Sequence, residues 1–169
     1  SLSGVGKRVS KGEALWYERE FTVPKQWKGK NVLLHFGAVD WHAEVFVNDV
    51  FLGEHKGGYD PFSFDVTPAL KKSGKQVIRV KVQDATDNSF QPRGKQCIIN
   101  AGIWYTPVTG IWQTVWMEPV SSAYVKNYYA VSDIDKGEIA FEVDARTADG
   151  DVVKVALLEG GIGYSAESP

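Results

Sequence analysis

Short stretches in which every second residue is apolar, separated by turn-forming residues, are the feature that most constrains how this chain folds. Because successive side chains of a strand point to opposite faces, each stretch predicts a strand with one face in a core. Many short strands with almost no helix indicate an all-β protein, an antiparallel sandwich or barrel. The alternating stretches lie at residues 15–23, 32–36, 43–47, 78–82 and 111–117.

Two local signals refine this prediction. Asn48-Asp49 follows one alternating stretch and predicts a tight hairpin turn, because both residue types tolerate a positive φ. Residues 67–72 predict a single helical turn, with Thr67 as the cap and Pro68 at the first helical position.

The strand pattern breaks near Pro119, which predicts a domain boundary. Three further alternating stretches follow, at residues 124–131, 139–145 and 153–157. Three strands are too few to close a sandwich, and the glycine-rich tail at 160–165 predicts a flexible end. We therefore expect one domain at residues 1–120 and an incomplete second β-domain at residues 121–169.

Charge and composition exclude several functional classes. A net charge of -2 without a long basic run argues against a nucleic-acid-binding protein. The apolar runs are too short to span a membrane. A single cysteine, Cys97, excludes an internal disulfide framework and a cysteine-based metal site, and it leaves the cellular compartment open. The three histidines, His35, His42 and His55, lack metalloenzyme spacing, so no metal or other cofactor is expected.

Glu18 and Glu20 are the one pair of carboxylates that could suggest acid–base catalysis. Retaining glycosidases need two carboxyl groups about 5–5.5 Å apart across a cleft. Residues two apart on a strand share one face at about 6.5–7 Å, and this face is expected to be solvated. We therefore assign no catalytic residue in the chain.

The segment from Asp84 to Gly110 interrupts the strand pattern and carries the most informative chemistry. Loops beyond about 12–15 residues are usually functional or disordered, and this one is too apolar for disorder. We expect an ordered loop packed against another surface.

Sugars are bound by amide, carboxylate and guanidinium groups together with aromatic faces, and this loop contains all of them. A polar surface loop of ordinary composition is the alternative explanation. The candidate sugar-cleft residues are Asp84, Asp87, Gln91, Arg93, Lys95, Gln96, Trp104 and Tyr105.

Five motifs stand in a fixed order between residues 15 and 118. They are LWYEREFTVP at 15–24, VFVND with LGEH at 45–55, GGYDPFSFDVT at 57–67, GKQ at 94–96 and TGIWQTVWME at 109–118. Together they resemble the N-terminal sugar-binding domain of glycoside hydrolase family 2, a family of β-galactosidases and β-glucuronidases. The chain departs from this pattern at Asp49, where the family usually has glycine.

The resemblance implies a galactose-binding-like jelly-roll β-sandwich followed by an immunoglobulin-like β-sandwich, of which residues 121–169 would be the start. It also implies a TIM barrel beyond these domains, where two glutamates perform a retaining hydrolysis. The first domain would then be a non-catalytic accessory domain whose long loop reaches the mouth of the barrel.

The partners expected from this resemblance are a carbohydrate substrate, bound by the intact enzyme, and the protein's own catalytic barrel; an oligomer is left open. The sugar would be a β-galactoside, with β-glucuronides and β-mannosides as alternatives. Two other classes also fit the sequence, an autonomous carbohydrate-binding module and a protein-docking sandwich.

Overall fold

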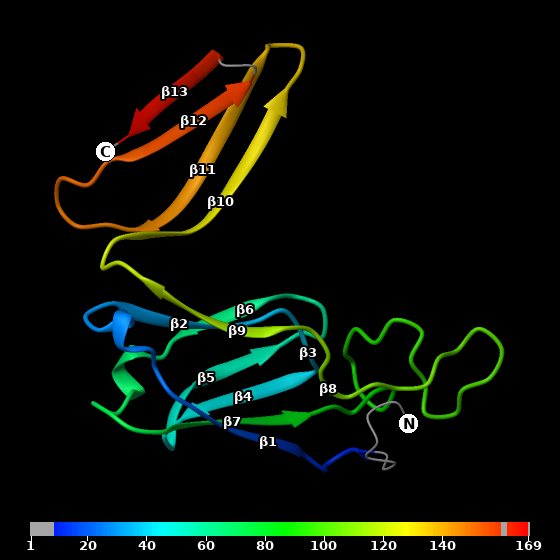
Figure 1. The fold of residues 1–169 in the computed structure, drawn as a ribbon. Coiled ribbons are helices and arrows are strands. Elements are labelled where there is room, and N and C mark those ends of the chain that lie inside the picture. Colours follow the sequence, from blue (N-terminus) through cyan, green and yellow to red (C-terminus); the bar gives the residue numbers. More distant parts are fainter. Residues whose placement is uncertain (1–8, 160–161, 169) are drawn as a thin grey trace. The chain divides into compact units, whose positions relative to one another are not determined.

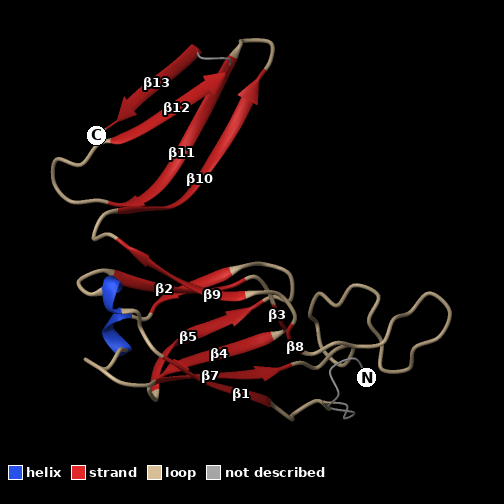
Figure 2. Ribbon diagram, in the orientation of Figure 1, coloured by secondary structure: helices blue, strands red, loops and turns tan. Residues whose placement is uncertain are grey.

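The computed structural model describes residues 9–159 and 162–168, and these residues form strands with two short 3-10 turns (Figures 1 and 2). The chain divides into two compact units, Ser1–Pro119 and Val120–Pro169. The all-β prediction is confirmed. No helix within the described ranges is long and apolar enough to cross a membrane.

The first unit is a β-sandwich of antiparallel strands. One sheet has the strand order β1-β7-β4-β5, a second has the order β6-β2-β9, and β3 pairs with β8. The bounds are β1 Leu15–Phe21, β2 Asn31–Phe36, β3 Val39–Asp40, β4 His42–Val47, β5 Val50–Lys56, β6 Phe62–Asp65, β7 Gln76–Gln83, β8 Gly110–Ile111 and β9 Val115–Val120, with 3-10 turns η1 Lys25–Trp27 and η2 Thr67–Ala69.

Alternating apolar residues of the two sheets fill the core between them. Leu34 and Phe36 of β2 are buried together with Val45 of β4 and Val80 and Val82 of β7. Each such side chain contributes about 1.5–3 kcal/mol when it leaves water. The alternation read from the sequence is therefore the physical cause of this sandwich.

The predicted hairpin turn at Asn48-Asp49 is confirmed. Both residues have a positive φ, 50° and 67°, and they connect β4 to β5. The Asn48 side chain also reaches outside the hairpin. Its Nδ2 donates to Ala69 O at 2.8 Å, and its Oδ1 accepts from Val77 N at 3.0 Å.

Two local predictions for this unit are wrong in detail. The helical turn predicted at residues 67–72 is the three-residue turn η2, which Thr67 does not cap. Thr67 Oγ1 instead accepts a hydrogen bond from Val32 N at 2.8 Å, so the hydroxyl ties the turn to β2. The strand predicted at residues 111–117 is divided into β8 and β9, because the chain leaves its pairing with β3 and then joins β2.

The second unit consists of two antiparallel hairpins. β10 Tyr124–Asp133 pairs with β11 Glu138–Arg146, and β12 Val153–Glu159 pairs with β13 Ile162–Ser168. The flexible tail predicted at 160–165 is wrong where the structure describes it, since β13 occupies residues 162–168 and positions 160–161 lie outside the described residues. Its glycines and serines weaken the strand pattern in the sequence, and pairing with β12 supplies the order. The immunoglobulin-like identity of this unit stays a prediction.

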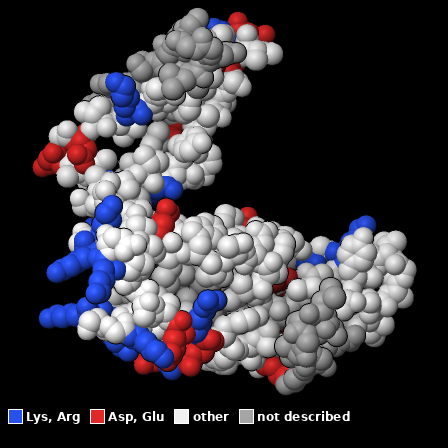
Figure 3. All heavy atoms as spheres, viewed as in Figure 1, with Lys and Arg blue, Asp and Glu red and all other residues white. Residues whose placement is uncertain are grey.

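Charged side chains are unevenly placed on the first unit. On the face shown in Figure 3, Lys and Arg gather at the end away from the long loop between β7 and β8, and acidic side chains lie among them. Two acidic residues of this unit, Glu18 and Glu20, lie in β1. Glu18 pairs with Arg79 at 2.6 Å, and Glu20 pairs with Lys75 at 2.5 Å. Both carboxylates are more than half exposed, which confirms the solvated face predicted for this strand.

Candidate functional site

The loop between β7 and β8 carries all eight candidate residues and projects from one end of the first unit (Figure 1). It leaves β7 after Gln83 and returns at Gly110 without any intervening strand. An isolated parallel bridge joins Gln96 to Tyr105 within it. The prediction of a long irregular segment is confirmed, and hydrogen bonds hold it in one conformation.

Asp84 closes the base of the loop. The residue is only 5% exposed, and its Oδ1 accepts hydrogen bonds from Thr86 N at 2.7 Å and from Gln91 Nε2 at 2.6 Å. Its Oδ2 accepts from Thr109 Oγ1 at 2.7 Å. Asp84 therefore joins the start of the loop to its end, and Gln91 is held in the same cluster.

Asp87 forms a second internal connection. Its Oδ2 accepts from Cys97 Sγ at 2.9 Å and from Ile98 N at 3.1 Å, while Arg93 Nη1 lies 3.8 Å away. The hydrogen bond from the Cys97 thiol, followed by that from Ile98, lowers the pKa of Asp87. The carboxylate thus stays ionised and fixes the outer half of the loop. Cys97 is half-buried and forms no disulfide with another described residue.

Gln96 attaches the loop to the sandwich. Its Nε2 donates to Asp40 Oδ2 at 3.0 Å, and its Oε1 accepts from Val108 N at 2.5 Å. Asp40 lies in β3 and is 5% exposed. Burial raises the pKa of Asp40, the nearby Asp84 charge adds to this rise, and the Gln96 bond opposes it.

Sequence reasoning missed Asp40 as a member of this site. A signal was present, because Asp40 is a lone carboxylate between Val39 and Trp41 in an apolar stretch. A buried carboxylate needs a hydrogen-bonding partner. The partner comes from a residue 56 positions later, which the sequence does not reveal.

Arg93, Lys95, Trp104 and Tyr105 form the displayed part of the loop. The Arg93 guanidinium lies 5.8 Å from the Trp104 ring centroid, and Lys95 Nζ lies 5.9 Å from that of Tyr105. Trp104 is 41% exposed and Tyr105 63%. Tyr105 N donates to Lys95 O at 2.8 Å, which fixes the two neighbouring cation–aromatic pairs. Such pairs combine N–H donors with aromatic faces, the two groups that bind sugars.

The loop also exposes large apolar side chains. Phe90 is fully exposed, and Ile99 and Ile103 are 85% and 67% exposed. Large exposed apolar patches usually mark interaction sites, and these three side chains all belong to this one loop. We expected the loop to pack against another surface. These three side chains stay largely exposed in the first unit, so for them the expectation is not met.

The histidines have ordinary structural contacts. His35 stacks on Trp116 with ring centroids 4.9 Å apart, His42 Nε2 lies 2.8 Å from Glu54, and His55 stacks on Phe62 at 4.2 Å. Within the described part of the chain, no three His, Cys, Asp or Glu side chains come close enough to hold a metal ion.

Comparison with known proteins finds relatives of this chain among glycosidases. Residues 7–118 match the family described as "Glycosyl hydrolases family 2, sugar binding domain". A beta-galactosidase of Thermoanaerobacter pseudethanolicus is 36% identical over 119 residues, which are 70% of this chain and 15% of the relative. A beta-glucuronidase of Formosa agariphila is 32% identical over 111 residues, 66% of this chain and 11% of the relative.

The fold is shared with a solved enzyme. The crystal structure of Ruminococcus gnavus beta-glucuronidase superposes with a TM-score of 0.71 and 21% identity, over 94% of this chain and 28% of that one. The chain thus spans between 11% and 15% of the length of the two curated relatives named above.

Proposed function

The chain belongs to glycoside hydrolase family 2, as a sugar-binding domain, and from that premise we propose that it is the non-catalytic accessory domain of a retaining glycosidase that hydrolyses β-galactosides. In this proposal the loop between β7 and β8 lines the cleft of a catalytic barrel in the same polypeptide. The substrate class follows the beta-galactosidase relative, and the second unit is proposed to begin an immunoglobulin-like domain.

The observation that carries this proposal is that some candidate side chains of the loop are hydrogen-bonded internally while others are exposed to solvent. Asp84, Asp87 and Gln96 use their hydrogen-bonding groups inside the unit. Trp104 is exposed, and the partly exposed Arg93 lies over its ring. A site whose supporting residues are fixed by internal bonds binds its ligand with less loss of entropy. The cleft role is therefore proposed for Arg93, Lys95, Trp104 and Tyr105, with the other four candidates as supports.

The exposed Phe90, Ile99 and Ile103 fit the proposed partner. An apolar loop surface that is wet in this unit gains stability when another surface covers it, at about 25 cal/mol per Å². The proposal assigns that surface to the protein's own catalytic barrel.

The carboxylates of this unit favour a non-catalytic role. A retaining mechanism needs one carboxyl whose pKa is raised and a second about 5–5.5 Å away. Glu18 and Glu20 are each held by a basic side chain on an exposed strand. Asp87 has a lowered pKa, and the buried Asp84 accepts hydrogen bonds on both oxygens. Burial raises the pKa of Asp40, but this carboxyl is only 5% exposed, which closes it to a substrate. The catalytic pair is therefore proposed to lie outside this chain.

A β-glucuronide is the second candidate substrate. The Formosa agariphila relative is a beta-glucuronidase, and Arg93 and Lys95 offer two cations where a uronate carboxylate would need them. Comparing kcat/KM of the intact enzyme on p-nitrophenyl β-galactoside and β-glucuronide decides between the two sugars.

The cleft role is tested by the crystal structure of the intact enzyme with a bound sugar or sugar-like inhibitor. The proposal expects the Arg93 guanidinium within hydrogen-bond distance of the ligand and Trp104 or Tyr105 against it. A loop that points into bulk solvent in that complex refutes the cleft role.

A further inference from the structure

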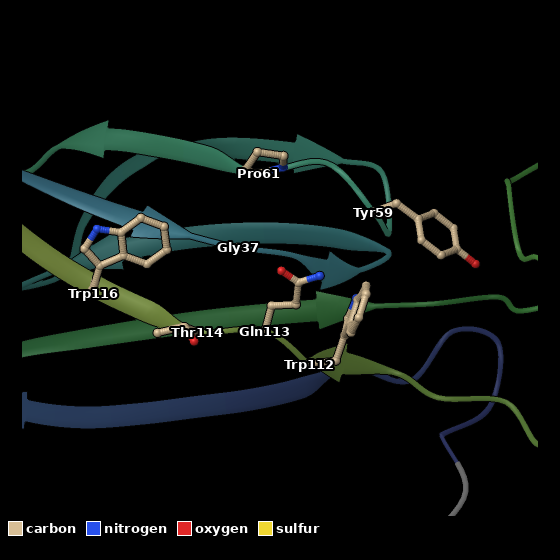
Figure 4. Close-up of a pocket in the computed structure, with 7 residues that line it drawn as sticks. All are labelled: Gly37, Tyr59, Pro61, Trp112, Gln113, Thr114 and Trp116. Carbon is tan, nitrogen blue, oxygen red and sulfur yellow. The ribbon is translucent and has the colours of Figure 1, made fainter. Parts of the chain in front are cut away.

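A groove lies at one end of the sheet β6-β2-β9, and it borders the long loop where Tyr59 approaches Gly94 (Figure 4). Its volume is about 660 Å³, within the range of small-molecule sites. None of its lining residues is charged, and none belongs to the candidate residues of the loop. They are Gly37, Tyr59, Pro61, Trp112, Gln113, Thr114 and Trp116.

The aromatic rings of the groove are fixed before any ligand arrives. Trp116 stacks on His35 with ring planes 12° apart, and His35 Nε2 lies 3.0 Å from Glu118 Oε1 without the geometry of a hydrogen bond. At the other end Trp112 Nε1 donates to Gly58 O at 2.8 Å, and Tyr59 packs edge-on against the Trp112 ring. A ring that is already immobilised loses little entropy on binding.

These rings nevertheless remain open to solvent. Trp116 is 44% exposed, Trp112 47% and Tyr59 49%. Rings held this firmly, yet half uncovered, leave apolar faces available for another molecule.

Gln113 supplies the polar centre of the groove. Figure 4 shows its amide between Trp116 on one side and Trp112 and Tyr59 on the other. The side chain is exposed and makes no hydrogen bond to another described residue. The position needs Gly37 beneath it, because a Cβ there would lie 2.9 Å from Gln113 Oε1. The hydroxyl-bearing Thr114 lies next to it.

From this arrangement we propose that the groove is a second carbohydrate-binding site, which takes a β-linked oligosaccharide. Neighbouring pyranose rings present apolar C–H faces, which match the aromatic rings at the two ends. Their hydroxyl groups can bond both the donor and the acceptor of the central amide. The absence of charged residues among the seven that line the groove fits a neutral glycan better than a uronate. The site does not depend on the role of the long loop.

The test is titration of the chain with neutral β-linked oligosaccharides. Cellotetraose, xylotetraose and lactose are added while tryptophan fluorescence and backbone NMR shifts are followed. At least one glycan binds with a Kd of about 1 mM or tighter. Gln113→Ala and Trp116→Ala each weaken this binding about tenfold or more, because each removes a central contact.

Two matched controls separate this groove from other exposed tryptophans. Trp104→Ala alters the long loop, and Trp16→Ala removes a 59% exposed ring on β1. Trp16→Ala keeps the wild-type Kd within twofold, whereas Trp104→Ala, which removes a ring assigned above to the cleft, reports whether the glycan binds at the loop instead. Gln113→Ala is the variant least able to disturb folding, since the Gln113 side chain is exposed. The circular dichroism spectrum of every variant must match that of the wild type.

Three results overturn the proposal. One is the lack of any response at about 10 mM glycan. Another is a loss of binding in Trp104→Ala that Gln113→Ala does not share, which moves the ligand to the loop. The third is a structure of the intact enzyme in which its own polypeptide covers the groove, so that no glycan can enter. A long loop that fails to contact substrate in the intact enzyme contradicts the accessory role and leaves this inference standing.

Discussion

Asp84 shows at the residue scale how a polar group in a candidate binding loop can serve the structure of the loop itself. Its buried carboxylate accepts hydrogen bonds from both Thr86 and Thr109. Thr109 lies 25 residues after Asp84 in the sequence. The composition of the loop could be used to predict where the candidate site lies. It could not separate the residues that support the loop from those it displays, because that separation depends on contacts between distant positions.

Replacement of Asp84 is expected to destabilise the first unit. Asp84→Ala leaves Thr86 N–H, Thr109 O–H and the Gln91 amide without their acceptor, so the free energy of unfolding falls by about 2–4 kcal/mol. Gln91→Ala is the matched control and lowers it by about 1 kcal/mol. Urea unfolding measures both, and a change below about 0.5 kcal/mol in Asp84→Ala contradicts this role.

His55 is expected to make stability depend on pH. Its Nε2 is buried, and burial lowers its pKa, partly opposed by the Asp60 charge and by the Gly57 backbone. The unfolded value is about 6.5. The contribution of the neutral ring is therefore complete above that pH and is lost as the pH falls through the lower folded pKa.

The measurement is urea unfolding between about pH 7.5 and pH 5. The free energy of unfolding declines toward the acid end in the wild type, and His55→Phe removes most of that slope. Equal slopes in the two proteins show that another group titrates in this range.

At the scale of elements, the loop and the sandwich are joined by the Asp40–Gln96 bond. Gln96→Ala removes it together with the acceptor for Val108 N–H. Amide hydrogen exchange at residues 95–108 is expected to accelerate about tenfold or more, while the core strands keep their protection. Asn100→Ala, which removes a bond to Thr106 only, serves as the control and leaves this region unchanged.

Strand existence was more predictable than strand limits. β2, β4 and β7 follow from alternation alone, because one face of each is buried in the core. The division between β8 and β9 was not predictable, since alternation continues through Trp112 and Gln113. Hydrogen bonds to two different partners, β3 and β2, decide where pairing stops, and those partners are far away in the sequence.

At the scale of the whole molecule, the exposed apolar side chains of the loop are expected to promote self-association of the isolated chain. Phe90→Ser together with Ile99→Ser removes two of its most exposed side chains. The double variant should bind less of the dye ANS and self-associate less on gel filtration. The control pair Val50→Ser and Phe51→Ser, exposed on β5, leaves both readouts near the wild-type values. Equal behaviour of the two double variants contradicts a docking surface on the loop.

The family and the β-sandwich were recognisable from five motifs in order, and both are confirmed. The immunoglobulin-like identity of the second unit stays a prediction. A fold shared with a beta-glucuronidase at 21% identity carries no information about the sugar. Substrate choice depends on a few side chains around the cleft, and most of the relatives' length lies outside the part that this chain matches.

The central claim is that the loop completes a neighbouring cleft and performs no catalysis itself. The most direct test is kcat/KM of the intact enzyme on p-nitrophenyl β-galactoside, with Arg93→Ala compared with Arg19→Ala, an exposed residue of β1. Arg93→Ala is predicted to lower kcat/KM about tenfold or more and Arg19→Ala less than twofold, while the isolated chain gives no turnover. Sustained turnover by the isolated chain, or equal kcat/KM for both variants, contradicts the claim.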